Sequence, residues 1–286
     1  MEIGIGLPTT IPGVTGEQLL DWSRRAELAG FSSLGTLDRI VYPNYEPLTA
    51  LAAAAAVTER IRLTTAIAIL PYRVNAGLVA KQAATIHDLS GGRLVFGAAA
   101  GSRGDDYEGT GVPYGRLGAR FEEMLREIRA VWSGAERGFA GGIGPDVSGD
   151  PPALIVGGRA DAAFRRAAEL GDGWIMGAAT AEVFSECRAK LEDAFRAAGR
   201  SESPRALALQ YFALGDDVER DVRASVWDYY RSDGDYADMA AANVARGPDG
   251  VRARVKAFED AGCDELVLFP ASADPDHVDR LADAVL

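Results

Sequence analysis

The sequence predicts an α/β fold, a single (β/α)8 (TIM) barrel in which residues 1–286 form one domain. Short apolar runs alternate with helical patterns along the whole chain, and eight such pairs can be recognised. The length of 286 residues suits one barrel, which typically needs about 250 residues. No linker and no change of composition divides the chain, so we expect no second domain.

Each predicted strand is a short apolar run that ends at a glycine, a proline or a polar residue. Unbroken apolar runs are typical of parallel strands that are covered on both faces. An open, doubly wound sheet is the alternative, but the first strand lacks a phosphate fingerprint and eight regular units close naturally. We expect the strands at Ile3–Leu7, Phe31–Leu37, Ile61–Leu70, Arg93–Ala99, Ala153–Val156, Gly173–Met176, Ala206–Leu214 and Glu265–Pro270.

Helices are indicated by capping residues and by apolar side chains at helical spacing. Thr15 and Gln18 form a capping box for a helix that runs to Gly30. Asp161 is expected to cap the helix 162–170, and Gly171 to end it with a positive φ. Further helices are expected at 50–59, 76–89, 117–132, 184–195, 218–226, 251–261 and 274–286, with a loop or short hairpin at 133–152 and a polar, irregular segment at 232–247.

The stretch Pro151–Gly177 holds the clearest functional signal. A strand, the tight turn Gly157–Gly158 and a helix N-terminus follow one another there, so that backbone N–H groups and the helix dipole converge. Glycines let an anion approach the backbone, and Arg159 adds a positive charge. We therefore expect a phosphate site at this turn; the alternative is that the glycines only turn the chain.

Composition excludes several classes of partner. The net charge of −12 argues against nucleic acid and against anionic membranes, both of which reward clustered Lys and Arg. We expect neither a signal peptide nor a membrane-spanning segment, because the N-terminus lacks a basic region and no apolar run is long enough. Cys187 and Cys263 form no C-x-x-C motif and are expected to be buried and reduced, in a cytoplasmic protein. His87 and His277 are too few and too far apart for a metal site, which excludes a metal-dependent hydrolase.

Six segments of the chain follow one another in an order typical of one family. They are AELAGFSSLGTLDR, LTTAIAILPYR, LVAKQAATIHDLSGGRLVFGAAAG, RFEEMLREIRAVW, PPALIVGGRADAAFRRAAELGDGWI and FEDAGCDELVLFP. With them the chain resembles the bacterial luciferase-like flavin-dependent oxidoreductases, which include reduced-flavin monooxygenases and deazaflavin F420-dependent enzymes. The resemblance covers nearly the whole chain and implies a barrel that binds FMN or F420 in its C-terminal mouth.

The resemblance also implies which residues contact the cofactor. Its phosphate would lie at the turn described above, and the end of the third strand would lie under the isoalloxazine ring, where several members carry a cis non-proline peptide. Further ring contacts would come from the ends of the fourth and sixth strands. The implied cofactor-binding residues are Gly157, Gly158, Arg159 and Ala160 at the phosphate, Ala66 and Ile67 under the ring, and Ala99, Gly101, Ser102, Trp174, Ile175 and Met176 around it.

The chain departs from the family after the second strand. Members often read Asp-His there, whereas this chain has Asp38 followed by Arg39. An arginine stays charged and cannot donate a proton at ordinary pH. We expect these two residues to be catalytic, with Asp38 orienting Arg39 so that its guanidinium stabilises negative charge on the reduced flavin or substrate. The alternative is that they form a surface ion pair or a loop anchor.

The resemblance leaves three functions open. The first is a monooxygenase that uses reduced FMN and O2 on a small organic substrate, with a reductant or a flavin reductase as the source of electrons. The second is an F420-dependent hydride transfer, which is less favoured because the acidic chain shows no basic exit for the acidic F420 tail. The third is a flavin-binding protein without turnover. A homodimer is compatible with each of these functions.

Overall fold

The predicted barrel is confirmed. The computed structural model describes residues 1–286, apart from the side chain of Ala140. Eight parallel strands close into a barrel because β6 pairs with β7 and β1 pairs with β9, and a short ninth strand, β8, pairs with the end of β7. The strands are β1 (Glu2–Gly6), β2 (Ser33–Thr36), β3 (Arg62–Ile69), β4 (Leu94–Ala99), β5 (Ala153–Gly157), β6 (Gly173–Met176), β7 (Arg205–Ala213), β8 (Ala245–Arg246) and β9 (Glu265–Pro270).

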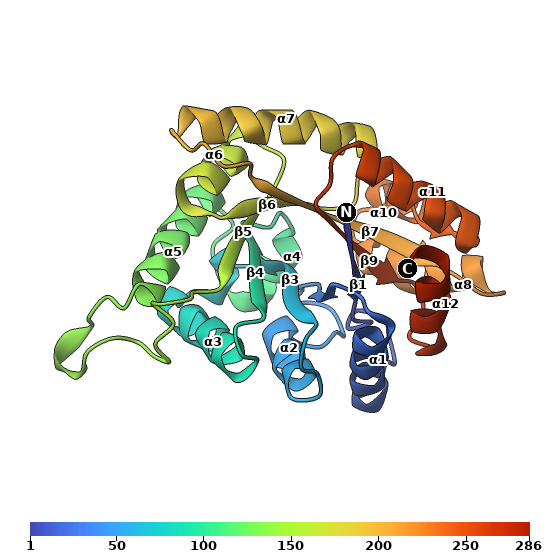
Figure 1. The fold of residues 1–286 in the computed structure, drawn as a ribbon, viewed down its shortest axis with the longest axis horizontal. Coiled ribbons are helices and arrows are strands. Elements are labelled where there is room, and N and C mark those ends of the chain that lie inside the picture. Colours follow the sequence, from blue (N-terminus) through green and yellow to red (C-terminus); the bar gives the residue numbers. More distant parts are fainter.

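Helices surround the strands on the outside of the barrel (Figure 1). The capping box of α1 is present: the Thr15 hydroxyl accepts from the Gln18 amide, and Gly30 closes the helix with a φ of 94°. Segment 133–152 contains one antiparallel bridge between Glu136 and Gly142, and it extends away from the barrel at the left of Figure 1. The longer helices are α1 (Gly16–Ala29), α2 (Pro47–Ala55), α3 (Ala76–Leu89), α5 (Leu117–Trp132), α6 (Asp161–Leu170), α7 (Ala181–Ala197), α10 (Gly234–Ala242), α11 (Gly247–Asp260) and α12 (Asp276–Val285), and the short ones are η1 (Pro71–Arg73), α4 (Gly104–Thr110), η2 (Gly138–Ala140), α8 (Val218–Val222), η3 (Arg223–Trp227) and α9 (Asp228–Tyr230).

Two details around α6 differ from the sequence expectation. Ala160 occupies the N-cap position, so Asp161 is the first helical residue. Its negative charge interacts favourably with the helix dipole, but its side chain does not cap the helix. Gly171 has an extended backbone with a φ of −105°, so its expected positive φ is wrong. A Cβ at this position would lie 3.0 Å from the Ala167 carbonyl oxygen and 3.1 Å from Val156. Glycine is therefore required here by close packing of the helix on β5.

Two segments that lack helical periodicity are nevertheless helical. α4 lies within 101–114, and α10 lies within the segment 232–247 that the sequence describes as irregular. In α10 the Asp233 carboxylate caps the Tyr236 amide at 3.2 Å, and Ala237 and Ala240 are buried at helical spacing. Small alanine side chains give a weak amphipathic signal, which explains why sequence reasoning missed this helix.

Strand side chains alternate between an outer core and the barrel interior. Trp174 and Met176 of β6 point outward and pack in the core between strands and helices, whereas Ile175 points into the barrel. Cys187 and Cys263 are buried and free, as expected. In the part of the chain that the structure describes, no helix combines the length and the apolar character needed to cross a bilayer. All eight barrel strands run in the same direction, so their carboxyl ends meet at one rim.

Candidate active site

A cavity of about 540 Å³ opens at this rim. Its walls come from the ends of β2, β3 and β4, from the loops after β5 and β6, and from the helices α9 and α10 that follow β7. In (β/α)8 barrels the active site lies on this face. Of the residues expected to contact a cofactor, those that line the cavity are Ala66, Ile67, Ala99, Gly101, Ser102, Gly157, Gly158, Arg159 and Ala160.

The turn between β5 and α6 forms one end of the cavity. Gly158 has a φ of 128°, which side chains other than glycine rarely adopt, and its carbonyl accepts a 2.6 Å hydrogen bond from the Trp174 indole. A Cβ at Gly157 would lie 2.7 Å from Ile67 Cδ1. The turn thus presents bare backbone to the cavity directly before the N-terminus of α6, with the exposed Arg159 beside it. These are the features of a phosphate cradle.

The end of β3 forms the floor of the cavity. The peptide between Ala66 and Ile67 is cis, as the resemblance implies, and the register between β3 and β4 shifts between Thr65 and Ala68. Gly97 of β4 makes room for this irregularity: a Cβ there would lie 2.1 Å from the Thr65 carbonyl oxygen. The floor therefore exposes small and aliphatic side chains toward the cavity, which suits a flat ring.

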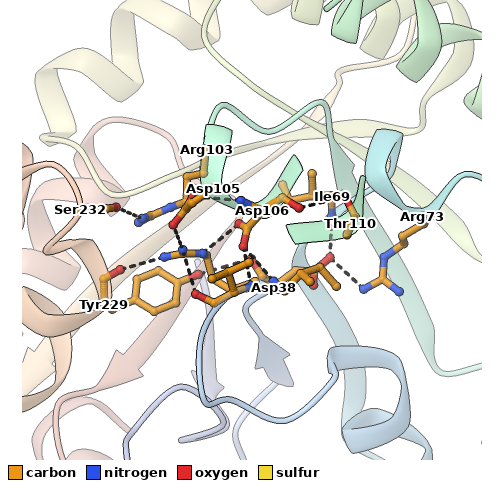
Figure 2. A network of polar contacts seen from close by, with 12 residues as sticks. Asp38, Ile69, Arg73, Arg103, Asp105, Asp106, Thr110, Tyr229 and Ser232 are labelled. Atoms are coloured by element: carbon orange, nitrogen blue, oxygen red, sulfur yellow. Dashed lines mark hydrogen bonds and ion pairs between the residues drawn. The ribbon is translucent and has the colours of Figure 1, made fainter. Parts of the chain in front are cut away.

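Asp38 lies in the cavity wall, with its side chain fully buried. Its Oδ2 accepts hydrogen bonds from the Ile69 amide and from Arg73 Nη2, both at 2.8 Å (Figure 2). Oδ1 has no hydrogen-bond partner among the described atoms of the protein. Burial raises the pKa of the Asp38 carboxyl, although the Arg73 guanidinium opposes the shift. The result is a buried carboxyl group in the wall whose Oδ1 lacks a partner at normal hydrogen-bond geometry, with the Tyr72 hydroxyl acting on the same carboxyl.

Arg39 is placed differently from the sequence expectation. Its Nε donates to Asp106 at 2.9 Å, its Nη2 donates to Asp105 at 2.5 Å, and a further donor reaches the Tyr229 carbonyl at 3.1 Å. The side chain is 4% exposed and lies outside the lining of the cavity. The expected pairing of Asp38 with Arg39 is wrong, because adjacent residues at the strand end point in different directions and each finds its partner on another loop.

The sixth strand contributes less to the cavity than the resemblance implies. Trp174 and Met176 face the outer core, and Ile175 lies in the barrel interior below the lining. Only the following residues, Gly177 and Ala178, reach the cavity from this strand. Trp174 instead supports the phosphate turn through its bond to Gly158. Side chains alternate along a strand, so Trp174 and Met176 both point to the outer core and cannot reach the cavity.

Several lining residues were missed by sequence reasoning. Tyr229, Tyr230 and Tyr236 come from the segment after β7, and Arg103 comes from the loop after β4. Burial raises the pKa of Tyr230 to about 12, so its hydroxyl stays protonated well into the alkaline range. The adjacent Tyr229 and Tyr230, next to a polar segment, were the sequence signal for an aromatic wall. Nothing in the local sequence indicates that this segment lies over the mouth of the cavity. Tyr72, Tyr107 and Arg166 also line the cavity.

Comparison with known proteins places the geometry in context. A family model described as luciferase-like monooxygenase matches residues 1–285. An uncharacterized protein of Mycobacterium tuberculosis is 33% identical over 211 residues, which cover 70% of this chain and 74% of that protein. An F420-dependent secondary alcohol dehydrogenase, solved with an F420-acetone adduct, superposes with a TM-score of 0.82 at 18% identity and covers 99% of this chain and 98% of its own. The FMN complex of a type II Baeyer-Villiger monooxygenase from Pseudomonas putida gives a TM-score of 0.75 at 18% identity and covers 99% and 96%.

Proposed function

This chain belongs to the luciferase-like monooxygenase family, and from that premise we propose that it is an oxidoreductase that holds reduced FMN in the cavity and oxygenates a small organic substrate with O2. One observation carries the proposal. The glycine turn at Gly157–Ala160 and the floor at Ala66–Ile67 line the same cavity, so that a phosphate and a flat ring can be held together. Close packing against Ile67 and Ala163 keeps the turn free of side chains, and bare backbone N–H groups beside a helix N-terminus fit a phosphate.

The cofactor supplies the redox chemistry and the chain supplies position and environment. Reduced FMN, when bound, would supply two electrons, so that one oxygen atom of O2 enters the substrate and the other leaves as water. The turn at Gly157–Ala160 would anchor the phosphate, and Ala99, Gly101 and Ser102 would border the ring. The aliphatic floor and the tyrosines of α9 and α10 would limit the access of water to the ring.

Asp38 is the residue that we propose for handling a proton. Its Oδ1, which lacks a partner at normal hydrogen-bond geometry, and its raised pKa allow the carboxyl to hold or accept a proton at the cavity wall, while Arg73 fixes Oδ2. We propose a positioning role for Arg39, which ties the loop after β2 to α4 through Asp106 and Asp105. Arg39 therefore acts on the shape of the rim and not on the reacting atoms.

F420-dependent hydride transfer is the second candidate, and a specific observation favours it. Arg103, Arg159 and Arg166 all line the cavity. The net charge of −12 suggested that no basic exit exists for an acidic cofactor tail, but a net charge describes the whole surface and not one rim. Under this alternative the same turn would hold the F420 phosphate and no O2 would be consumed.

Cofactor binding is the first test. The purified protein is titrated with FMN and with F420 in parallel, and fluorescence quenching gives each dissociation constant. Gly158→Val should raise the dissociation constant of the cofactor at least about tenfold. The reason is that Gly158 has a φ of 128° and that a Cβ there would lie 3.0 Å from Ala163, so the turn would be distorted. Gly199→Val is the matched control, since Gly199 also has a positive φ of 76° but lies at an exposed helix end with open space around it.

Turnover separates the remaining alternatives. Oxygen consumption with reduced FMN and a substrate panel supports the monooxygenase, and oxidation of reduced F420 without oxygen uptake supports hydride transfer. Binding of FMN or F420 without turnover on either panel would identify a flavin-binding protein instead. Unchanged affinity in Gly158→Val would show that the phosphate lies elsewhere.

A further inference from the structure

Arg103 is a cation held at the mouth of the cavity. Its guanidinium lies over the rings of Tyr229 and Tyr230, with the central carbon 5.1 Å and 4.8 Å from the two ring centroids. Nη1 donates to the Ser232 hydroxyl at 3.2 Å, as Figure 2 shows. Stacking on two aromatic faces fixes the direction of a side chain that is otherwise flexible.

Three of the neighbouring arginines are neutralised, whereas Arg103 and Arg159 form no ion pair among the described residues. Arg39 pairs with Asp105 and Asp106, Arg73 pairs with Asp38 and Glu46, and Arg166 pairs with Glu122. Arg103 forms no ion pair with any side chain that the structure describes. A guanidinium has five N–H donors, and the hydroxyl of Ser232 occupies only one of the donor atoms. Arg103 thus keeps N–H donors that no carboxylate of the described structure accepts.

Two carboxylates border the same outer groove, but both are already bonded. Asp105 accepts from Arg39 at 2.5 Å, and Asp233 accepts from the Tyr236 amide at 3.2 Å. Neither carboxylate forms a hydrogen bond or an ion pair with Arg103 in the described structure. An anion from outside the chain is the natural partner for this guanidinium.

The wall around Arg103 is aromatic. Tyr230 packs edge-to-face on Tyr229 at 4.8 Å and on Tyr236 at 4.9 Å, measured between ring centroids. The hydroxyls of Tyr230 and Tyr211 share a 2.8 Å hydrogen bond, which holds the Tyr230 ring in place. Preordered aromatic rings favour contact with a planar, apolar ligand. These tyrosines and the glycine turn line the same cavity.

We propose that Arg103 and the wall of Tyr229, Tyr230 and Tyr236 form a substrate subsite for aromatic carboxylates, in which the guanidinium binds the carboxylate and the tyrosines contact the ring. The inference rests on the proposed function, because it takes the cavity as the active site. A carboxylate can also come from the acidic tail of F420. The two sources share the chemistry that Arg103 recognises, and binding measurements distinguish them.

The first measurement uses benzoate and 2-naphthoate as probes, with the corresponding primary amides as uncharged controls. Binding to the apo protein and to the FMN-loaded protein is followed by calorimetry and by ligand-observed NMR. Arg103→Met should weaken both carboxylates at least about tenfold and leave the amides within twofold. Arg103→Lys should retain part of the affinity because the charge remains and the planar donor fork is lost. Arg231→Met is the matched control, since Arg231 lies in the same segment but pairs with Asp228 and is 62% exposed.

Charge reversal adds a readout that a structural role would not produce. Arg103→Glu should lose the carboxylates and bind benzylamine better than the parent protein does. A thermal melt of each variant checks that it is folded. The proposal is overturned if neither carboxylate binds the parent protein, or if Arg103→Met binds both carboxylates as the parent does.

Measurements of cofactor binding distinguish a carboxylate substrate from the carboxylate tail of F420. Under the proposal, Arg103→Met leaves the dissociation constants of FMN and F420 within about twofold. A loss of F420 affinity alone, with benzoate and 2-naphthoate binding unchanged, assigns Arg103 to the cofactor tail and overturns the substrate subsite. Carboxylate binding that depends on Arg103 in a protein that binds neither FMN nor F420 upholds the subsite while the proposed function fails.

Discussion

Arg39 shows how far a residue's role can depart from its place in the sequence. It follows the second strand at the functional rim, yet its guanidinium donates hydrogen bonds to Asp105, Asp106 and two backbone carbonyls. Asp106 is 3% exposed at its side chain and also accepts from the Ile40 and Val41 amides. Arg39 thereby compensates a buried carboxylate that holds the loop after β2 against α4.

Removal of Arg39 should destabilise the fold before it affects chemistry. Arg39→Ala leaves Asp106 buried without its cation, and breaking a buried pair in this way costs about 3–5 kcal/mol. Arg39→Lys should lose less because the charge is kept. Urea unfolding measures both. Arg231→Ala, which breaks an exposed pair, should be close to neutral. An Arg39→Lys protein that is as stable as the parent but turns over slowly would show instead that Arg39 acts on the reacting groups.

Among the helices, α5 and α6 are joined by a charged cluster close to the phosphate turn. Glu122 of α5 accepts from Arg165 at 2.9 Å and from Arg166 at 3.1 Å, both on α6, and pairs with Arg126 on its own helix at 2.8 Å. These bonds, with the Arg165 hydrogen bond first, lower the pKa of Glu122 to about 2. The cluster ties the helix that begins at Asp161 to its neighbour.

The lowered pKa fixes the direction of a pH effect. A carboxyl whose pKa falls on folding stabilises the protein above its unfolded pKa of about 4.5, and the contribution disappears as the pH falls toward 2. Glu122→Gln should therefore cost about 1 kcal/mol at pH 7, the scale of well-formed surface pairs, and almost nothing near pH 2. Denaturant unfolding at both pH values tests this. Glu123→Gln, one residue along on the exposed face, should show no such pH dependence. An equal cost at both pH values would contradict the ionic explanation.

The helices α4 and α10 at the rim are more exposed than the barrel strands. α4 has seven residues with a glycine at its start, and α10 exposes Met239 at 54%. We expect 101–114 and 232–247 to exchange amide hydrogens faster than β3 and β4, because most of their residues are exposed or half-buried. Hydrogen exchange followed by mass spectrometry measures this. Protection equal to that of the strands would mean that the mouth is rigid and that substrates enter without movement of these segments.

At the scale of the whole molecule, the two ends of the barrel carry different tasks. The carboxyl ends of the strands surround the cavity, whereas the amino ends meet at Glu265. Its side chain is fully buried and accepts from Ser32 at 2.7 Å, Ser33 at 2.6 Å and Arg205 at 2.5 Å, with Arg62 at 3.3 Å. Burial alone would raise the pKa of Glu265, but the two arginines and the serine hydroxyls hold it below its usual value. One carboxylate thus links residues at the starts of β2, β3, β7 and β9.

Glu265→Ala should separate stability from binding. The variant leaves Arg62, Arg205 and two serines without their shared acceptor, and a loss of about 3–5 kcal/mol is expected. Cofactor affinity per folded molecule should stay within twofold, because the amino ends of barrel strands serve stability. Urea unfolding and cofactor titration of one preparation test both halves. Glu2→Ala, which removes an exposed carboxylate from the same arginines, is the control. Weaker cofactor binding at unchanged stability would contradict this division.

The sequence alone determined what depends on neighbours along the chain. Strand positions follow from short apolar runs, the cap of α1 from Thr15 and Gln18, and the glycine turn from one contiguous stretch. Local patterns fail where the local signal is weak, as in the alanine-rich α10. They also misjudge glycines such as Gly171, whose reason is a close approach by residues of another element.

Only the tertiary structure decided which side chains meet at the site. Arg39 pairs with Asp106 across 67 positions and contacts Tyr229 across 190, while Asp38 turns to Arg73. Arg103 reaches Ser232 across 129 positions. The sequence does not show which arginine pairs with which carboxylate, because charge alone does not specify a partner. The closure of the barrel brings the loops to one rim, and close packing there selects the partners and leaves Arg103 without an ion pair in the described structure.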